Sequence, residues 1–216
     1  MFLVVEKDGK NIATHHEYST PEKYNSALLI PSILKIFQNN DLKPSDIDVI
    51  AINSGPGSFT GIRAGAVVAR TLGQFLDVPV IAIPSLEIYA NAYDSDKDKY
   101  VILDAKRSKW YTGVYSSNNL VIQEPLLKKN TDVLDEIKNA EYQIITEVAL
   151  LEPLEKFKPV LFNEINKDFG LVLTELVKQK LSEVDDYKEY YKWYKLKPTY
   201  LQTPSISMPK KKNYIK

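Results

Sequence analysis

The residues best suited to chemistry gather in one glycine-rich turn, SGPGSFTGIRAG at Ser54–Gly65. A turn of this kind that opens a helix presents free backbone N–H groups to an anion. Gly57, Ser58, Thr60 and Arg63 are therefore candidates for binding an anion or a nucleotide. In the plainer alternative, Ser58 or Thr60 serves only as the N-cap of the helix. Without further context, the residues favour this alternative.

The turn does not match either standard phosphate-binding motif. A P-loop requires Lys directly after its last glycine, but Ile62 follows Gly61. A dinucleotide-binding fingerprint requires a third glycine at position 60, which is Thr60. Any anion site here would be of another kind.

Other catalytic or metal-binding sets are missing from the sequence. There is no Cys, and the only two His residues are the adjacent pair His15 and His16. Neighbouring side chains of a strand point to opposite faces, so this pair cannot converge on one metal ion. Asp104, after the predicted strand YVIL, is the only acid well placed for a nucleotide, and a lone Asp is more often a turn residue. We predict no metal site and no catalytic residues.

The helix predicted over residues 60–76 carries a stripe of small residues. Gly61, Gly65, Ala69 and Gly73 recur every four residues and so lie along one face. Each glycine inside a helix costs about 1 kcal/mol relative to Ala, and a close helix–helix contact is the usual compensation. We expect the stripe to lie at a subunit interface. The alternative is that it packs on the protein's own sheet or on the helix of residues 20–38.

The elements predict an α/β protein in two halves. Strands are expected at the N-terminus on either side of EKDGK, and a helix with Thr20 as N-cap follows. The strands DVIAIN and VPVIAIP flank the glycine helix as a βαβ unit. The polar run SDKDK predicts a boundary, which divides the chain into an N-terminal half (1–98), a C-terminal half (99–204) and a basic tail (205–216).

Charge is unevenly distributed along a chain with no net charge. From Lys188 onward there are eight Lys residues and one acid, whereas residues 1–187 hold 20 basic and 27 acidic residues. The stretch YKEYYKWYKLKPTY interleaves Lys with aromatic residues, as RNA-binding segments do, unless Trp193 and the tyrosines pack on the second half. No apolar run is long enough to span a membrane, and no signal peptide is present, so a cytoplasmic location is expected.

The segment GPGSFTGIRAGAVVARTLG resembles the signature of the bacterial TsaB (YeaZ) family, which takes part in making threonylcarbamoyladenosine in tRNA. The resemblance continues through ALLIPSIL, VPVIAIPSLE and LDAKRSKWYTGVY, which occur in the family's order. PTYLQTP resembles the closing motif, with Gln202 where Arg is usual. The match covers about the first 115 residues well and the rest loosely.

The resemblance implies an actin-like/Hsp70-like (ASKHA) fold and a non-catalytic role. Family members act as partners of a TsaD-type catalytic paralogue, and a TsaE-type ATPase joins the complex, which acts on tRNA. The helices matching residues 20–38 and 60–76 form the partner interface and also homodimers, which adds Leu29 and Ile33 to the predicted interface residues. No cofactor is expected to bind tightly, although ATP or ADP could bind at a subunit interface.

The chain departs from the family at its start, where relatives have a strand ending in an Asp-Thr-Ser turn, the first phosphate loop. Here MFLVV runs into EKDGK with no such turn. Either that segment is deleted, or the given start lies too far downstream. The alternative function is an independent nucleotide-binding protein or ATPase of the actin-like superfamily. Such enzymes hold Mg-nucleotide with acidic and glycine turns from both halves, which this chain has largely lost.

Overall fold

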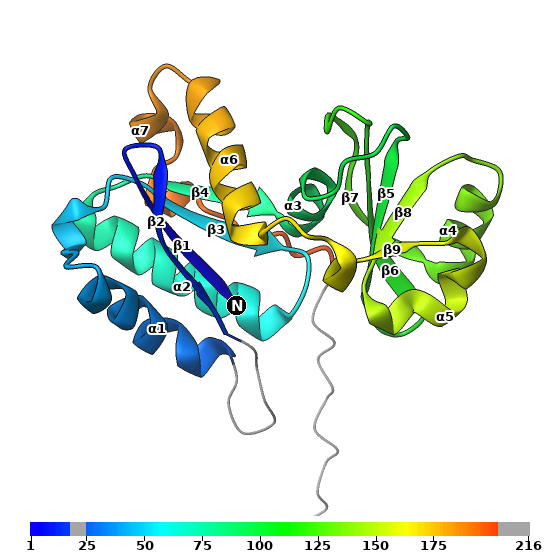
Figure 1. Ribbon diagram of the computed structural model, residues 1–216, viewed down its shortest axis with the longest axis horizontal. Coiled ribbons are helices and arrows are strands. Elements are labelled where there is room, and N and C mark those ends of the chain that lie inside the picture. The colour runs from blue at the N-terminus through cyan, green and yellow to red at the C-terminus, as the bar shows by residue number, and fades with distance from the viewer. Residues whose placement is uncertain (18–24, 203–216) are drawn as a thin grey trace, which may run out of the picture.

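A computed structural model of the protein describes residues 1–17 and 25–202, which form two lobes side by side (Figure 1). Both lobes combine helices with strands, which confirms the predicted α/β class. The predicted helix start at Thr20 and the basic tail 205–216 lie outside the described residues.

The N-terminal lobe begins with a hairpin of β1 (Phe2–Lys7) and β2 (Lys10–His16). Its turn is Asp8-Gly9, with φ angles of 51° and 75°. Two central residues with positive φ match the right-handed twist of the strands, and Asp-Gly is a preferred sequence for such a turn. The predicted strands on either side of EKDGK thus pair as a tight hairpin.

A βαβ unit follows, as predicted. The parallel strands β3 (Ile50–Gly55) and β4 (Val80–Pro84) are joined by α2 (Phe59–Leu76) and pair from Ile50 opposite Val80 onward. Helix α1 (Asn25–Asn39), which contains Pro31, packs against α2. Ala66 and Ala69 of α2 are buried against Val80.

The C-terminal lobe contains one five-stranded mixed sheet in the order β7-β6-β5-β8-β9. Helix α4 covers one face, where Val133 and Ile137 pack on Tyr100 and Trp110. The lobe's elements are β5 (Lys99–Asp104), β6 (Lys109–Tyr115), β7 (Val121–Lys129), α4 (Asn130–Lys138), β8 (Gln143–Thr146), α5 (Leu151–Leu154) and β9 (Val160–Leu161).

The chain then returns to the N-terminal lobe. Helix α6 (Phe169–Ser182) buries Val172 and Leu176 against Ile81 and Ile83 of β4. Helix α7 (Tyr187–Tyr190) follows α6 on the same lobe (Figure 1). The predicted C-terminal half of 99–204 therefore needs correction, because apolar packing places α6 on the first half. The sequence boundary marks where the chain leaves the N-terminal lobe but not where it comes back.

The strands of the two lobes are arranged differently. In the N-terminal lobe β1–β2 and β3–β4 are separate two-stranded sheets, whereas the C-terminal lobe has one continuous sheet. Helix α6 contacts β1, β3 and β4 and so covers both pairs.

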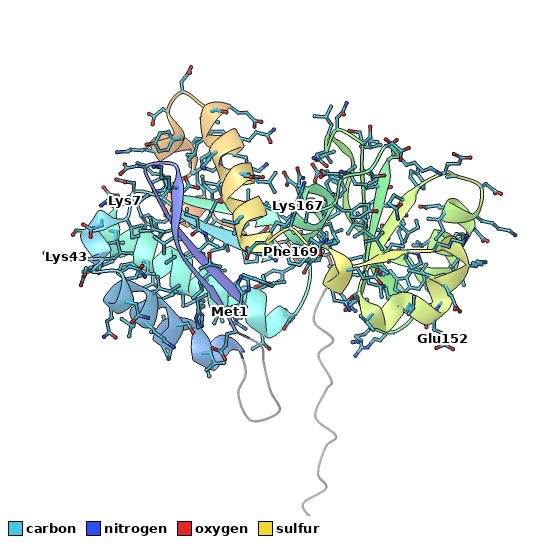
Figure 2. The ribbon with its side chains drawn as sticks, in the orientation of Figure 1. Met1, Lys7, Lys43, Glu152, Lys167 and Phe169 are labelled. Carbon is cyan, nitrogen blue, oxygen red and sulfur yellow. The ribbon has the colours of Figure 1, made fainter. Side chains whose placement is uncertain are left out.

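Aromatic rings connect the lobes. Helix α3 (Ser85–Asn91) lies between them and buries Leu86 and Ala90 against the five-stranded sheet. Its Tyr89 stacks on Phe162 with ring centroids 3.9 Å apart and meets Phe169 edge-on at 5.1 Å. Phe169 begins α6 at the base of that helix (Figure 2), so these rings join α6 to the second lobe through α3.

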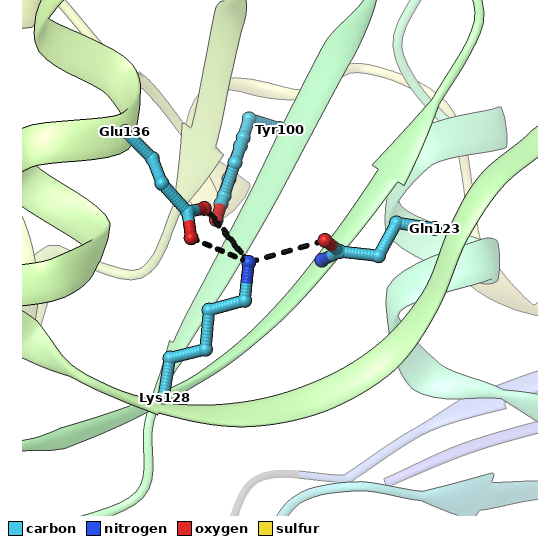
Figure 3. A network of polar contacts seen from close by, with 4 residues as sticks. All are labelled: Tyr100, Gln123, Lys128 and Glu136. Carbon is cyan, nitrogen blue, oxygen red and sulfur yellow. Dashed lines mark hydrogen bonds and ion pairs between the residues drawn. The ribbon is translucent and has the colours of Figure 1, made fainter.

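A polar network lies at the edge of the C-terminal core (Figure 3). The Tyr100 hydroxyl donates to Glu136 over 2.7 Å, and the Lys128 ammonium lies 2.7 Å from the same carboxylate. Lys128 also donates to Gln123 over 3.1 Å. Burial raises the pKa of Glu136, but the bonds from Lys128 and Tyr100 and the charge of Lys128 outweigh it, so the net pKa is lowered.

Candidate partner-binding site

The glycine-rich turn follows β3 and leads directly into α2. The Ser58 hydroxyl accepts a hydrogen bond from the Gly61 N–H over 3.4 Å and is the N-cap of α2. The Asn53 side-chain oxygen accepts from the Gly55 N–H over 2.9 Å and from the Ser85 hydroxyl over 2.6 Å. Ser58 thus has the capping role of the plainer alternative.

The interior of this turn is packed by the protein itself. The Thr199 N–H donates to the Ser54 carbonyl over 2.8 Å, and their hydroxyls lie 3.3 Å apart. A Cβ at Gly55, which has φ +94°, would lie 2.6 Å from the Ile62 side chain and 3.4 Å from the Thr199 carbonyl. The Tyr200 ring lies 5.4 Å from the Phe59 ring. The segment 198–202 therefore packs directly on the glycine-rich turn and covers its backbone.

Two of the predicted anion-binding residues lie together on the outer side of α2. A hollow of about 500 Å³ is lined by apolar residues with Thr60 and Arg63, namely Phe59, Thr60, Arg63, Ala64, Val67 and Val68. Gly57 belongs to the turn behind it. A ligand there would meet mostly apolar side chains, which suit a protein surface better than a phosphate group.

Asp104 has a structural role in the second lobe. Its carboxylate accepts from the Lys106 N–H over 2.8 Å and lies 2.5 Å from the Lys106 ammonium. The Asp104 N–H donates to Glu147 over 2.7 Å. Burial raises the pKa of Asp104, but the hydrogen bonds and charge of Lys106 outweigh it and lower the pKa overall. The structure thus places Asp104 at the end of β5, where its carboxylate is bound by Lys106 of the following turn, a structural role like the alternative raised from the sequence.

The small-residue stripe of α2 divides into two parts. Ala69 is buried against Val80, and a Cβ at Gly73 would lie 2.4 Å from the Val80 side chain and 3.0 Å from Trp193. The predicted subunit interface is therefore wrong for Ala69 and Gly73, because the protein's own strand and C-terminal segment occupy that face. A Cβ at Gly65 would meet nothing within 4 Å, and one at Gly61 would meet only Ser58, so both stay candidates.

Trp193 packs on the first lobe and not on the second half, where packing was expected as the alternative. It lies against β4 and α2, with Leu196 buried beside it. Tyr191 packs on the α6 side of the same lobe. Lys192 and Lys195 both lie within 4 Å of the Glu189 carboxylate. Much of the predicted basic and aromatic segment is thus part of the fold.

Exposed apolar side chains stand on both α1 and α2, which pack side by side. We call these side chains together the α1–α2 apolar face. Its members are large apolar side chains with exposed fractions of 47% to 80%: Ile30, Leu34, Phe59, Val67 and Phe75. Leu29 and Ile33, predicted as interface residues, are half-buried on α1. Phe59, Val67 and Phe75 were not predicted from the sequence, because the stripe of small residues was taken as the interface side of α2.

The two histidines have separate partners. The His15 imidazole lies 3.3 Å from the Glu17 carboxylate, and that of His16 lies 2.7 Å from Asp168, the N-cap of α6. Among residues 1–17 and 25–202, no three His, Asp or Glu side chains gather as a metal site requires.

Comparison with known proteins identifies the family. The family model described as "TsaD: tRNA N6-adenosine threonylcarbamoyltransferase" matches residues 19–172. The tRNA threonylcarbamoyladenosine biosynthesis protein TsaB of Bacillus subtilis is 33% identical over 148 residues. The chain belongs to the TsaB (YeaZ) family. A TsaB protein of Buchnera aphidicola is 32% identical over 117 residues.

These TsaB relatives are matched only in part. The B. subtilis alignment covers 68% of this chain and 59% of the relative, and the Buchnera alignment covers 50% and 56%. The chain thus spans less than two thirds of the curated relatives it matches.

Solved structures bear out the fold. A Pseudomonas aeruginosa protein described as similar to peptidase YEAZ superposes with a TM-score of 0.73 at 20% identity, over 92% of this chain and 93% of that one. YeaZ from P. aeruginosa superposes with a TM-score of 0.65 at 20% identity, over 83% and 87%. The predicted actin-like/Hsp70-like (ASKHA) fold is confirmed.

Within the described ranges, no helix of this TsaB-family protein is long and apolar enough to cross a bilayer.

Proposed function

We propose that this TsaB-family protein is a non-catalytic subunit of the cytoplasmic complex that transfers a threonylcarbamoyl group to adenosine 37 of tRNA. It docks to a TsaD-type catalytic paralogue through the α1–α2 apolar face, and a TsaE-type ATPase joins the same complex. The same face holds two copies of this protein together when the paralogue is absent.

The observation that carries the proposal is the exposure of this face. Leu34 and Val67 are 56% and 58% exposed, and Phe75 is 80% exposed. Large apolar side chains gathered on two neighbouring helices are costly to leave in water, and such patches mark protein–protein contacts.

The non-catalytic role is supported by the packing of the glycine-rich turn and by the ion pair of Asp104. Thr199 and Ile62 occupy the space directly beside Gly55, so the backbone of the turn is covered there by the protein itself. Asp104 is already paired with Lys106. The protein binds no cofactor tightly on its own, and ATP or ADP would be held only together with a partner, on the side of α2 that carries Thr60 and Arg63.

The test is co-purification with the TsaD-type paralogue from the same genome. Leu34→Asp and Val67→Asp should each weaken the complex, because each buries an unpaired carboxylate at an apolar contact. The matched control is Val148→Asp, since Val148 is also 58% exposed but lies on the second lobe. Loss of the complex in all three variants, or in none, would argue against docking through α1 and α2.

A separate assay addresses the alternative of an independent ATPase. The purified protein with Mg-ATP should show only background hydrolysis. Turnover that Asp104→Ala abolishes would overturn the non-catalytic role.

A further inference from the structure

The turn between β5 and β6 has a backbone that its sequence does not favour. Lys106, Arg107 and Ser108 have φ angles of 64°, 56° and 56°. The Lys109 N–H donates to the Lys106 carbonyl over 3.2 Å, which closes a four-residue turn around two central residues with positive φ. Such turns strongly favour Asn-Gly or Asp-Gly, because a side chain with a Cβ is strained at positive φ.

The β1–β2 hairpin shows what an unstrained sequence looks like in the same protein. Its two positive-φ residues are Asp8 and Gly9. The β5–β6 turn instead keeps three consecutive residues that carry side chains, two of them basic. All residues from 106 to 109 are exposed, so burial of these side chains does not compensate for the strain. Strain retained at an exposed turn suggests a function for its side chains.

Cations gather at this end of the sheet. Lys106, Arg107 and Lys109 come from the turn, and Lys129 of β7 stands directly opposite Lys109. We call these four residues the basic turn. Like charges in opposed positions of a sheet destabilise it. Asp104 pairs with Lys106, but no carboxylate of the described chain forms an ion pair with Lys109 or Lys129.

The first turn of a helix adjoins the same place. The Asn130 N–H, at the start of α4, donates to the Ser108 carbonyl over 3.1 Å. The positive end of the helix dipole therefore lies beside the basic turn, although Asp132 in the same first turn of α4 offsets part of it.

We propose that the basic turn contacts the phosphate backbone of RNA. This inference rests on the proposed function, which brings the protein into a complex that acts on tRNA. Lys and Arg side chains supply sequence-independent affinity by releasing the counterions of phosphate groups. A planar guanidinium such as that of Arg107 can also bind one phosphate through two hydrogen bonds.

The first test removes two of the charges. The variant Lys109→Ala/Lys129→Ala is assembled with the TsaD-type and TsaE-type subunits, and its binding to tRNA is measured over a salt series. Loss of two phosphate contacts should reduce the slope of log affinity against log salt by about two and weaken binding by about tenfold to a hundredfold near 0.1 M salt. The control is Lys7→Ala/Lys10→Ala, which removes an equally opposed Lys pair beside Asp8-Gly9.

The second test separates the side chains from the fold. Arg107→Asn/Ser108→Gly gives the turn its favoured sequence, so the melting temperature should rise. RNA binding should nevertheless weaken, by about threefold to tenfold for one lost contact. A merely structural turn would become more stable without any change in RNA affinity.

The outcomes separate this proposal from the proposed function. A wild-type complex that does not assemble overturns both. An assembled complex whose two variants keep the wild-type salt slope overturns only the RNA contact. If the variants instead lose the TsaD-type subunit, the basic turn binds an acidic protein surface, and the assignment to RNA is wrong.

Discussion

Adding one methyl group at either of two glycines of α2 should have opposite effects on stability. A Cβ at Gly73 would lie 2.4 Å from the Val80 side chain, 3.0 Å from Trp193 and 3.3 Å from the Val78 carbonyl. A Cβ at Gly65 would meet nothing within 4 Å. Gly73→Ala therefore tests whether the stripe is internal packing, and Gly65→Ala is its matched control in the same helix.

The expected magnitudes follow from two opposing contributions. Replacing a helical Gly by Ala stabilises by about 1 kcal/mol, and this contribution acts at both positions. Overpacking at Gly73 costs about 1–3 kcal/mol, because Val80 lies in a buried strand and cannot move away freely. Gly65→Ala should raise the free energy of unfolding by up to about 1 kcal/mol. Gly73→Ala should lower it by about 1 kcal/mol.

Thermal or urea unfolding of the isolated protein measures this difference. A separation of about 2 kcal/mol corresponds to about 4–8 °C between the melting temperatures of the two variants in a chain of this size. Gly73→Ala as stable as Gly65→Ala would refute the close approach of α2 to β4 and Trp193. The division of the stripe into a packed part and an open part at Gly61 and Gly65 would then be wrong as well.

Three further changes test other parts of the structure. Tyr100→Phe should destabilise the second lobe by about 1 kcal/mol in urea unfolding, because it removes the bond to Glu136. Glu136 has a lowered pKa in the folded state, so its contribution to stability is present above the unfolded value of 4.5 and is lost as the pH falls through the folded pKa. The stability difference between wild type and Glu136→Gln should thus vanish in acid, and a difference that grows there would contradict the network of Figure 3. Gly65→Leu should leave the monomer folded but weaken its association in sedimentation, and unchanged association would place Gly65 outside the interface.

The sequence alone predicted much of the architecture. Local signals sufficed for the Asp8-Gly9 hairpin turn, the βαβ unit around α2 and the strand that ends at Asp104. These features depend on turn chemistry and hydrophobic periodicity within short windows. The glycine signature also sufficed to indicate the family.

The rest depends on contacts between distant segments. Thr199 lies 145 residues beyond Ser54, and no spacing rule predicts that it closes the glycine-rich turn. The position of α6 on the first lobe also depends on long-range contacts, namely its apolar packing on Ile81 and Ile83. The periodicity of α2 showed a stripe of small residues but not which way it faces, so Gly73 was assigned to the wrong side.

The most direct test of the proposed function is reconstitution of threonylcarbamoyl transfer. The TsaD-type and TsaE-type subunits from the same genome are combined with tRNA, with and without this protein, and threonylcarbamoyladenosine is measured. We expect formation of the modified base to require this protein, to persist with Asp104→Ala and to fall with Val67→Asp. Full activity in its absence, or activity abolished by Asp104→Ala in an assembled complex, would contradict a non-catalytic partner that docks through the α1–α2 apolar face.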